Sequence, residues 1–371
     1  TRWVLIVGPN RTFLRYIDQV LPSLGETAVL LRTIGDLFPG VSAERAEPAE
    51  VAALKGSPVM AEVIAAAVRD RQEVPESVWE IVTTDAHPGL GYQPEVLRLH
   101  PAACRRAREQ ARASRLPHNR AREVFAEVLV DALARQVADR LGEDPYADME
   151  LPAGGGYAGF EPDPRAPENL LGEGDVARIA AELAADPNVR DAIGRLWPVL
   201  TPQQLLTELY ASDERLAAAA PQLSEAERGL LRRSPGGGWS VADVPLLDEA
   251  AELLGEPVDP GAGRRTRQEE RERLEYALGV LEIAYGSRSI DVEDEAEPDI
   301  LAAHDLLDAS GLARRQEVRD HRSVAERAAA DRTWLFGHVI VDEAQELSAM
   351  AWRALMRRCP SRSMTIVGDV A

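Results

Sequence analysis

Two acidic signals near the C-terminal end of the sequence have residue types and spacing that suit chemistry on phosphates. The segment HVIVDEAQ places Asp342 and Glu343 after an apolar run, and the segment TIVGDVA places Gly368 and Asp369 after another. In phosphoryl transfer, an Asp at a strand end can hold Mg²⁺, usually through water, while an adjacent Glu orients or deprotonates the attacking water. A neighbouring strand that ends in Gly-Asp can couple a bound nucleotide to movement.

A plainer interpretation of these residues also has weight. A lone Asp-Glu pair after a strand is common, and it usually adds charge to a loop or caps the N-terminus of a helix. The two signals together are more specific, because a helix of suitable length is predicted between them at Ser348–Arg358. The pair of signals therefore favours phosphate chemistry over a merely charged loop.

Short apolar runs predict the strands that position these residues. At the N-terminal end the runs are Trp3–Val7, which stops at Gly-Pro-Asn, and Val29–Leu31, with helical spacing of apolar residues between them. At the other end they are Val339–Val341 and Met364–Val367. Such runs are typical of buried parallel strands, and ligands bind beyond the carboxyl ends of such sheets. The sequence thus predicts an α/β fold in which both chain ends contribute to one parallel sheet.

Helical patterns dominate between the two ends. Residues 1–45 are expected to form the first part of the sheet domain, residues 46–235 a mostly helical insertion, and residues 236–371 the second part. A glycine- and proline-rich segment at 151–169 is expected to be a loop. The helices that the apolar spacing predicts are Met60–Arg71, Cys104–Leu116, Ala121–Leu141, Asp175–Ala185, Pro202–Ala220 and Ser240–Leu254, the last with Ser240 as its N-cap.

An acidic run lies in a long loop expected at about 256–301. Its carboxylates are Asp291, Glu293, Asp294, Glu295, Glu297 and Asp299. Most such runs are solvated turns that only aid solubility. A run of this kind also imitates a line of phosphates, so it could enter a basic channel built for nucleic acid or share a metal ion there.

The composition of the chain bounds its partners and its location. The 371 residues carry a formal net charge of −20, and Lys55 is the only lysine. The overall field repels phosphates, so nucleic-acid binding is expected to be weak unless a local arginine cluster provides it, and a basic protein surface is the favoured partner. The two cysteines are unclustered and no apolar run reaches membrane-spanning length, which indicates a cytoplasmic protein without a membrane partner.

Several of these segments resemble a known class of motor proteins. Val339–Gln345 and Ile366–Asp369 look like motifs II and III of UvrD-type superfamily 1 helicases, and Trp3–Asn10 resembles their motif Ia. HelD-type ATPases, which act on bacterial RNA polymerase, show a closer resemblance, carried by Gly8–Glu26, Ser240–Gly255 and His338–Asp369. These segments cover less than a third of the chain, but their order and spacing frame all of it.

The resemblance implies a fold and a set of roles. The fold would be a RecA-like motor domain, called 1A, split by an insertion that opens the DNA clamp of RNA polymerase and by a loop that enters a polymerase channel. Asp342 would be the Mg²⁺ ligand, Glu343 the catalytic carboxylate, and Gln345 a link to the γ-phosphate or to motif III. Gly368 and Asp369 would belong to motif III and would contribute to nucleotide binding. The acidic run at 291–299 would contact the polymerase core.

The sequence also departs from the motor family. It contains no G-x-x-x-x-G-K-[ST] phosphate-binding loop, and Lys55 lacks the glycine framework that such a loop needs. The residues after Asp342 and Glu343 suit the HelD class better than UvrD itself. We therefore expect a piece of a larger ATPase. ATP and Mg²⁺ would be cofactors of the full-length protein, and the piece alone would neither bind nor hydrolyse ATP.

Three functions from different classes remain open at this point. The first is a part of an ATPase that releases nucleic acid from RNA polymerase and recycles the enzyme. The second is a UvrD-type DNA translocase or helicase in DNA repair, and the third is a non-catalytic binding module. A translocase should carry an exposed basic track for a single strand, and the sequence shows no continuous one.

Overall fold

The structure, a computed structural model, describes most of the chain in six stretches. These are residues 3–20, 29–84, 95–142, 171–257, 327–328 and 330–369. The glycine-rich segment at 151–169 and the acidic run at 291–299 lie outside the described residues, so neither prediction is tested by the fold.

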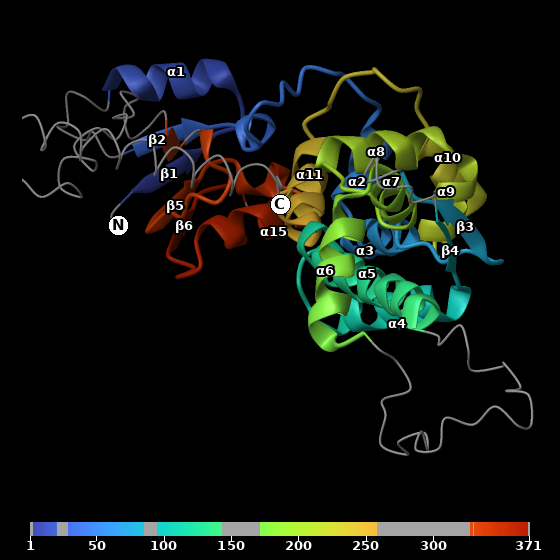
Figure 1. The fold of residues 1–371 in the computed structure, drawn as a ribbon. Helices are drawn as coiled ribbons and strands as arrows, with labels where there is room; N and C mark the ends of the chain where they lie inside the picture. The colour runs from blue at the N-terminus through green and yellow to red at the C-terminus, as the bar shows by residue number, and fades with distance from the viewer. Residues whose placement is uncertain are drawn as a thin grey trace, which may run out of the picture. The chain divides into compact units, whose positions relative to one another are not determined.

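Four parallel strands form the sheet that the two ends of the chain were expected to share (Figure 1). The strand order is β2 (Val29–Arg32), β1 (Val4–Val7), β5 (His338–Val341) and β6 (Met364–Ile366). Central β1 pairs with β2 on one side and with β5 on the other, with Leu5 opposite both Leu30 and Val339. The predicted α/β class with a parallel sheet is therefore confirmed.

The two connections between these strands run in opposite directions from the centre of the sheet. Helix α1 (Arg11–Val20) follows β1 and precedes β2, whereas α15 (Ala349–Arg358) joins β5 to β6. Crossovers between parallel strands are right-handed, so the two helices cover opposite faces of the sheet, as Figure 1 shows. The chain thus diverges between the carboxyl ends of β1 and β5, where open α/β sheets bind their ligands.

Among the described residues between the two ends, the chain forms helices of 7 to 25 residues and a hairpin. The hairpin of β3 (Trp79–Val82) and β4 (Val96–Leu99) was not predicted, because runs of four residues are too short for a period-two pattern to be recognised. The helices are α2 (Ala49–Gly56), α3 (Val59–Asp70), α4 (Pro101–Ala113), α5 (His118–Gly142), α6 (Glu173–Ala185), α7 (Pro187–Leu196), α8 (Pro202–Ala211), α9 (Asp213–Ala219), α10 (Glu225–Leu231) and α11 (Asp243–Leu254).

One predicted helix is in fact two. The apolar spacing predicted a single helix at 202–220, but Ser212 adopts an extended conformation between α8 and α9. Its hydroxyl accepts a hydrogen bond from the Arg215 N–H at 3.2 Å and so caps the second helix. Within the described residues no single helix is long and apolar enough to cross a membrane; only α2 and α3 together, bent by 73°, meet the length and composition.

Two hydrophobic cores hold the described residues together. The first joins Leu5 and Val339 of the sheet to apolar residues of α3, α8, α11 and α15. The second lies among α4, α5, α6, α7 and the hairpin, with the fully buried Trp197 in ring contact with Phe125 at 5.0 Å. The predicted apolar stripe of α5 faces this second core, where Leu129 and Leu133 are buried.

Helix α11 links the sheet to the helices, because it packs against α3, α8 and α15 and is buried over most of its surface. Regular helix begins at Asp243, later than predicted. The expected capping hydrogen bonds are nevertheless present: the Asp243 N–H donates to Ser240 Oγ at 3.3 Å, and the Ser240 N–H donates to Asp243 Oδ2 at 3.0 Å. The buried carboxylates of α11 need cationic partners, which neighbouring elements supply.

Candidate functional site

Main-chain hydrogen bonds fix Asp342 at the carboxyl end of β5. The Asp342 N–H donates to the carbonyl of Val7 on β1 at 3.0 Å, and the Val367 N–H donates to the carbonyl of Val341 at 2.8 Å. The strand end therefore holds its position from both neighbouring strands. The carboxylate also accepts the N–H of Glu343 at 3.0 Å, which restricts the orientation of the Asp342 side chain.

Glu343 adopts a left-handed backbone conformation, with φ 52° and ψ 45°. This region is unfavourable for residues other than glycine because Cβ approaches the following carbonyl oxygen, at a cost of about 1 kcal/mol. The conformation turns the chain out of the strand within one residue and starts the 3₁₀ turn Ala344–Glu346. Strain of this kind is often found at functional sites, where the surrounding structure maintains it.

Gln345 connects the ends of β5 and β6. Its Nε2 donates to Glu343 Oε2 at 2.5 Å, and its Oε1 accepts the N–H of Asp369 at 3.1 Å. Gly368 makes this possible, because a Cβ there would overlap Gln345 Oε1 and lie 3.0 Å from the Ala344 nitrogen. The structure therefore brings together the five residues predicted for the nucleotide site, and the Gln345 side chain joins the ends of β5 and β6.

The end of β1 lies beside this group and supplies polar side chains of its own. Asn10 Oδ1 accepts the N–H of Phe13 at 2.9 Å and so caps α1. Arg11 donates to Asp36 at 2.6 Å across the end of β2. Partial burial would raise the pKa of Asp36, but hydrogen bonds from Arg11 and Thr33 hold that pKa below its usual value. Asp36 is therefore a fixed anion at this end of the sheet.

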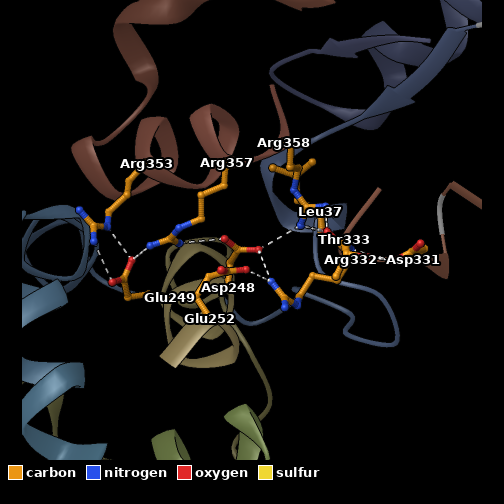
Figure 2. A network of polar contacts seen from close by, with 10 residues as sticks. All are labelled: Leu37, Asp248, Glu249, Glu252, Asp331, Arg332, Thr333, Arg353, Arg357 and Arg358. Carbon is orange, nitrogen blue, oxygen red and sulfur yellow. Dashed lines mark hydrogen bonds and ion pairs between the residues drawn. The ribbon is translucent and has the colours of Figure 1, made fainter. Parts of the chain in front are cut away.

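An ion network connects α15, the helix that follows the site, to α11. Figure 2 shows the arginines of α15 turned toward two adjacent carboxylates of α11. Arg353 binds both oxygens of Glu249, at 2.6 and 3.1 Å, and Arg357 contacts Glu249 and lies 3.0 Å from Asp248. Burial would raise the pKa of Glu249, but hydrogen bonds from these two arginines hold it below its usual value. Glu249 therefore remains charged, and both carboxylates are paired with arginines of α15.

Arg358 extends this network to the loops under the sheet. Its Nη2 donates to the carbonyl of Leu37 at 2.7 Å and lies 3.2 Å from Asp248, and its Nη1 donates to the carbonyl of Arg332 at 3.0 Å. Arg332 in turn binds Glu252 of α11 at 2.5 Å (Figure 2). The C-terminal end of α15 is thus fixed to α11, to the loop after β2 and to the segment before β5.

A second buried network surrounds Lys55, whose exposed fraction is 2%. Its Nζ lies 2.6 Å from Glu47 and 2.8 Å from Asp243, and Arg233 binds the other oxygen of Asp243 at 2.7 Å. Ser240 Oγ donates to Glu47 at 2.7 Å. The network joins the segment before α2 to the start of α11, which are far apart in the sequence.

Sequence analysis named the candidate site residues but did not predict these networks. Periodicity marks which positions face the interior, yet it carries no information about which buried charges meet. The signal that was available is that Lys55 is the only lysine of the chain and lies in an apolar helical segment, where an unpaired charge would be costly.

The donors at the site suit a magnesium ion that keeps most of its waters. Asp342 and Glu343 supply carboxylate oxygens at one strand end, and Mg²⁺ usually takes one or two carboxylates together with waters and phosphates. Among the residues that the structure describes, no group of three or more His, Cys, Asp or Glu side chains is placed to hold a metal ion. The residues present do not include a phosphate-binding loop, so they fit only the carboxylate side of a nucleotide site.

No family model and no curated protein sequence matches this chain.

Proposed function

We propose that this chain is part of a superfamily 1 helicase-like ATPase of the HelD type, which binds RNA polymerase. Its sheet would be part of the RecA-like 1A domain, with β1, β5 and β6 carrying motifs Ia, II and III. The observation that carries this proposal is the bridge that Gln345 makes between the Glu343 carboxylate and the Asp369 N–H. A bridge between the ends of adjacent parallel strands suits a site that couples nucleotide state to movement.

In this proposal each residue has a separate role. Asp342 would hold Mg²⁺, and the ion would neutralise phosphate charge in the full-length protein. Glu343 would orient or deprotonate the attacking water, and Gln345 would fix the direction of the Glu343 carboxylate. Because the sequence contains no G-x-x-x-x-G-K-[ST] loop, the chain by itself is not expected to hydrolyse ATP.

The proposed partner is the RNA polymerase core, and the proposed result is release of nucleic acid and recycling of the enzyme. A net charge of −20 supports a basic protein surface as partner more than nucleic acid. The acidic run at 291–299, which lies outside the described residues, is the proposed contact with a polymerase channel.

Capture of core RNA polymerase by the tagged 371-residue chain tests this proposal. The six carboxylates of the acidic run are neutralised to Asn or Gln in one variant. In the control variant each Asp is exchanged for Glu and each Glu for Asp, which keeps the charge. We expect capture by the wild type and the control and weaker capture by the neutral variant. Tight single-strand DNA binding without polymerase capture would instead favour the repair translocase.

A further inference from the structure

Gly56, the last residue of α2, lies directly against Ser348, the N-cap of α15. A Cβ at position 56 would lie 2.5 Å from Ser348 Cβ and 3.1 Å from Ser348 Oγ. Real Cβ atoms essentially never approach another carbon so closely, so only glycine fits while Ser348 stays in place. The Ser348 hydroxyl accepts the N–H of Ala351 at 3.2 Å and is therefore held by its own helix.

The helix that presents Gly56 is itself fixed. Lys55, the preceding residue, is tied to Glu47 at 2.6 Å and to Asp243 at 2.8 Å in the interior of the protein. Moving the end of α2 away from Ser348 would stretch these buried ion pairs, which are costly to break. Gly56 is therefore held in a fixed position against Ser348.

The position of Ser348 also restricts the position of the 3₁₀ turn that carries Gln345. The 3₁₀ turn ends at Glu346, and two short main-chain hydrogen bonds close it: Glu346 N–H to the carbonyl of Glu343 at 2.9 Å, and Leu347 N–H to the carbonyl of Ala344 at 3.2 Å. Only Glu346 and Leu347 separate Ser348 from Gln345, so we expect a shift of the N-cap to move the Gln345 side chain.

We propose that Gly56 and Ser348 are positioning residues of the candidate site. Their contact sets the turn 343–347 so that Gln345 reaches both the Glu343 carboxylate and the Asp369 N–H. A displacement of the end of α2 is transmitted to the site carboxylate through the contact of Gly56 with Ser348. The importance of this geometry for catalysis rests on the proposed function, whereas the contact and its effect on the turn do not.

Hydrogen exchange of the full chain, followed by mass spectrometry, tests the proposal in four variants. Gly56→Ala adds the overlapping Cβ. Ser348→Gly removes the atoms it would meet while keeping an acceptable N-cap. The double variant combines them, and Gly194→Ala in α7 is the control, since a Cβ there meets nothing within 4 Å.

In Gly56→Ala we expect exchange in peptides that cover 342–350 and 364–371 to rise about tenfold relative to peptides from α5, because the hydrogen bonds of Ala344 and Asp369 open locally. The double variant should return toward the wild-type rate, and Gly194→Ala should not differ from wild type. Uniform acceleration across the chain, or a double variant as fast as Gly56→Ala, overturns the proposal. If Gly56→Ala does not fold, recovery of folding in the double variant supports the contact and failure to recover overturns it.

Polymerase capture by the wild-type chain is a separate experiment that tests the proposed function. Loss of capture in the wild type would count against the proposed function, whereas the exchange comparison decides the role of the Gly56–Ser348 contact by itself.

Discussion

The carboxamide of Gln345 holds the carboxylate of Glu343 at 2.5 Å while it accepts the N–H of Asp369 at 3.1 Å. Glu343 is therefore oriented by a side chain that is also hydrogen-bonded to Asp369, just beyond the end of the neighbouring strand. The support from Gln345 and the left-handed backbone of Glu343 together fix the direction in which the carboxylate is presented.

The first prediction concerns the close approach at Gly368. Gly368→Ala should push Gln345 Oε1 away from the Asp369 N–H, because the new Cβ would overlap it and crowd the Ala344 nitrogen at 3.0 Å. Crowding of this kind should lower the free energy of unfolding by about 1 kcal/mol. Urea denaturation measures the change. Gly229→Ala in α10, where a Cβ meets nothing within 4 Å, is the matched control and should not be destabilised.

The second prediction concerns the backbone of Glu343. Glycine adopts the left-handed region without penalty, so Glu343→Gly relieves strain that offsets the entropy cost of a glycine. Glu62, an exposed residue inside α3, has ordinary helical surroundings, and Glu62→Gly should lower the free energy of unfolding by about 1 kcal/mol. We expect Glu343→Gly to be the less destabilising of the two in the same urea titration. A larger decrease in the free energy of unfolding for Glu343→Gly than for Glu62→Gly would contradict the interpretation that the Glu343 backbone is strained.

The strands of the sheet and their polar ends could be predicted from the sequence. Runs such as Trp3–Val7 and Val339–Val341 are apolar at every position, as expected for parallel strands covered on both faces, although alternate residues of β1 and β5 are only partly buried. The Gly, Asp and Glu residues that follow them mark the chain leaving the sheet. Parallel strands share one carboxyl edge, so the proximity of Glu343 to Asp369 followed from the pattern.

Contacts that depend on distant partners could not be predicted. Nothing local to Gly56 indicates that Ser348 lies against it, and nothing local to Lys55 indicates that Glu47 and Asp243 surround it. The left-handed conformation of Glu343 could not be predicted either, since a non-glycine residue prefers the right-handed helical or extended backbone regions. Long-range packing decides all three.

The third prediction concerns the Lys55 network. Lys55→Met leaves Glu47 buried without a cation and Asp243 with Arg233 as its remaining partner, and loss of one member of a buried pair costs about 3–5 kcal/mol. Urea denaturation should show a loss of this size. Arg11→Met removes a cation from the exposed pair with Asp36, and we expect no clear change there. Equal effects of the two substitutions would show that the interior tolerates an unpaired Glu47.

The last prediction is a pH dependence that originates at His118. Burial, with Arg71 and Arg122 nearby, lowers the pKa of His118 from 6.5 to about 4, although its Nε2 lies 2.8 Å from the carbonyl of Pro198, a contact that favours the charged form. Between these two values the unfolded chain binds a proton that the folded protein does not, so the free energy of unfolding falls as the pH is lowered through this window. With about 1.4 kcal/mol for each pH unit, the loss from pH 6.5 to about pH 4 is about 3 kcal/mol. His118→Gln should remove this slope in urea titrations at a series of pH values, whereas replacement of the exposed His100 should keep it. A variant at position 118 with the wild-type slope would assign the pH dependence to other groups.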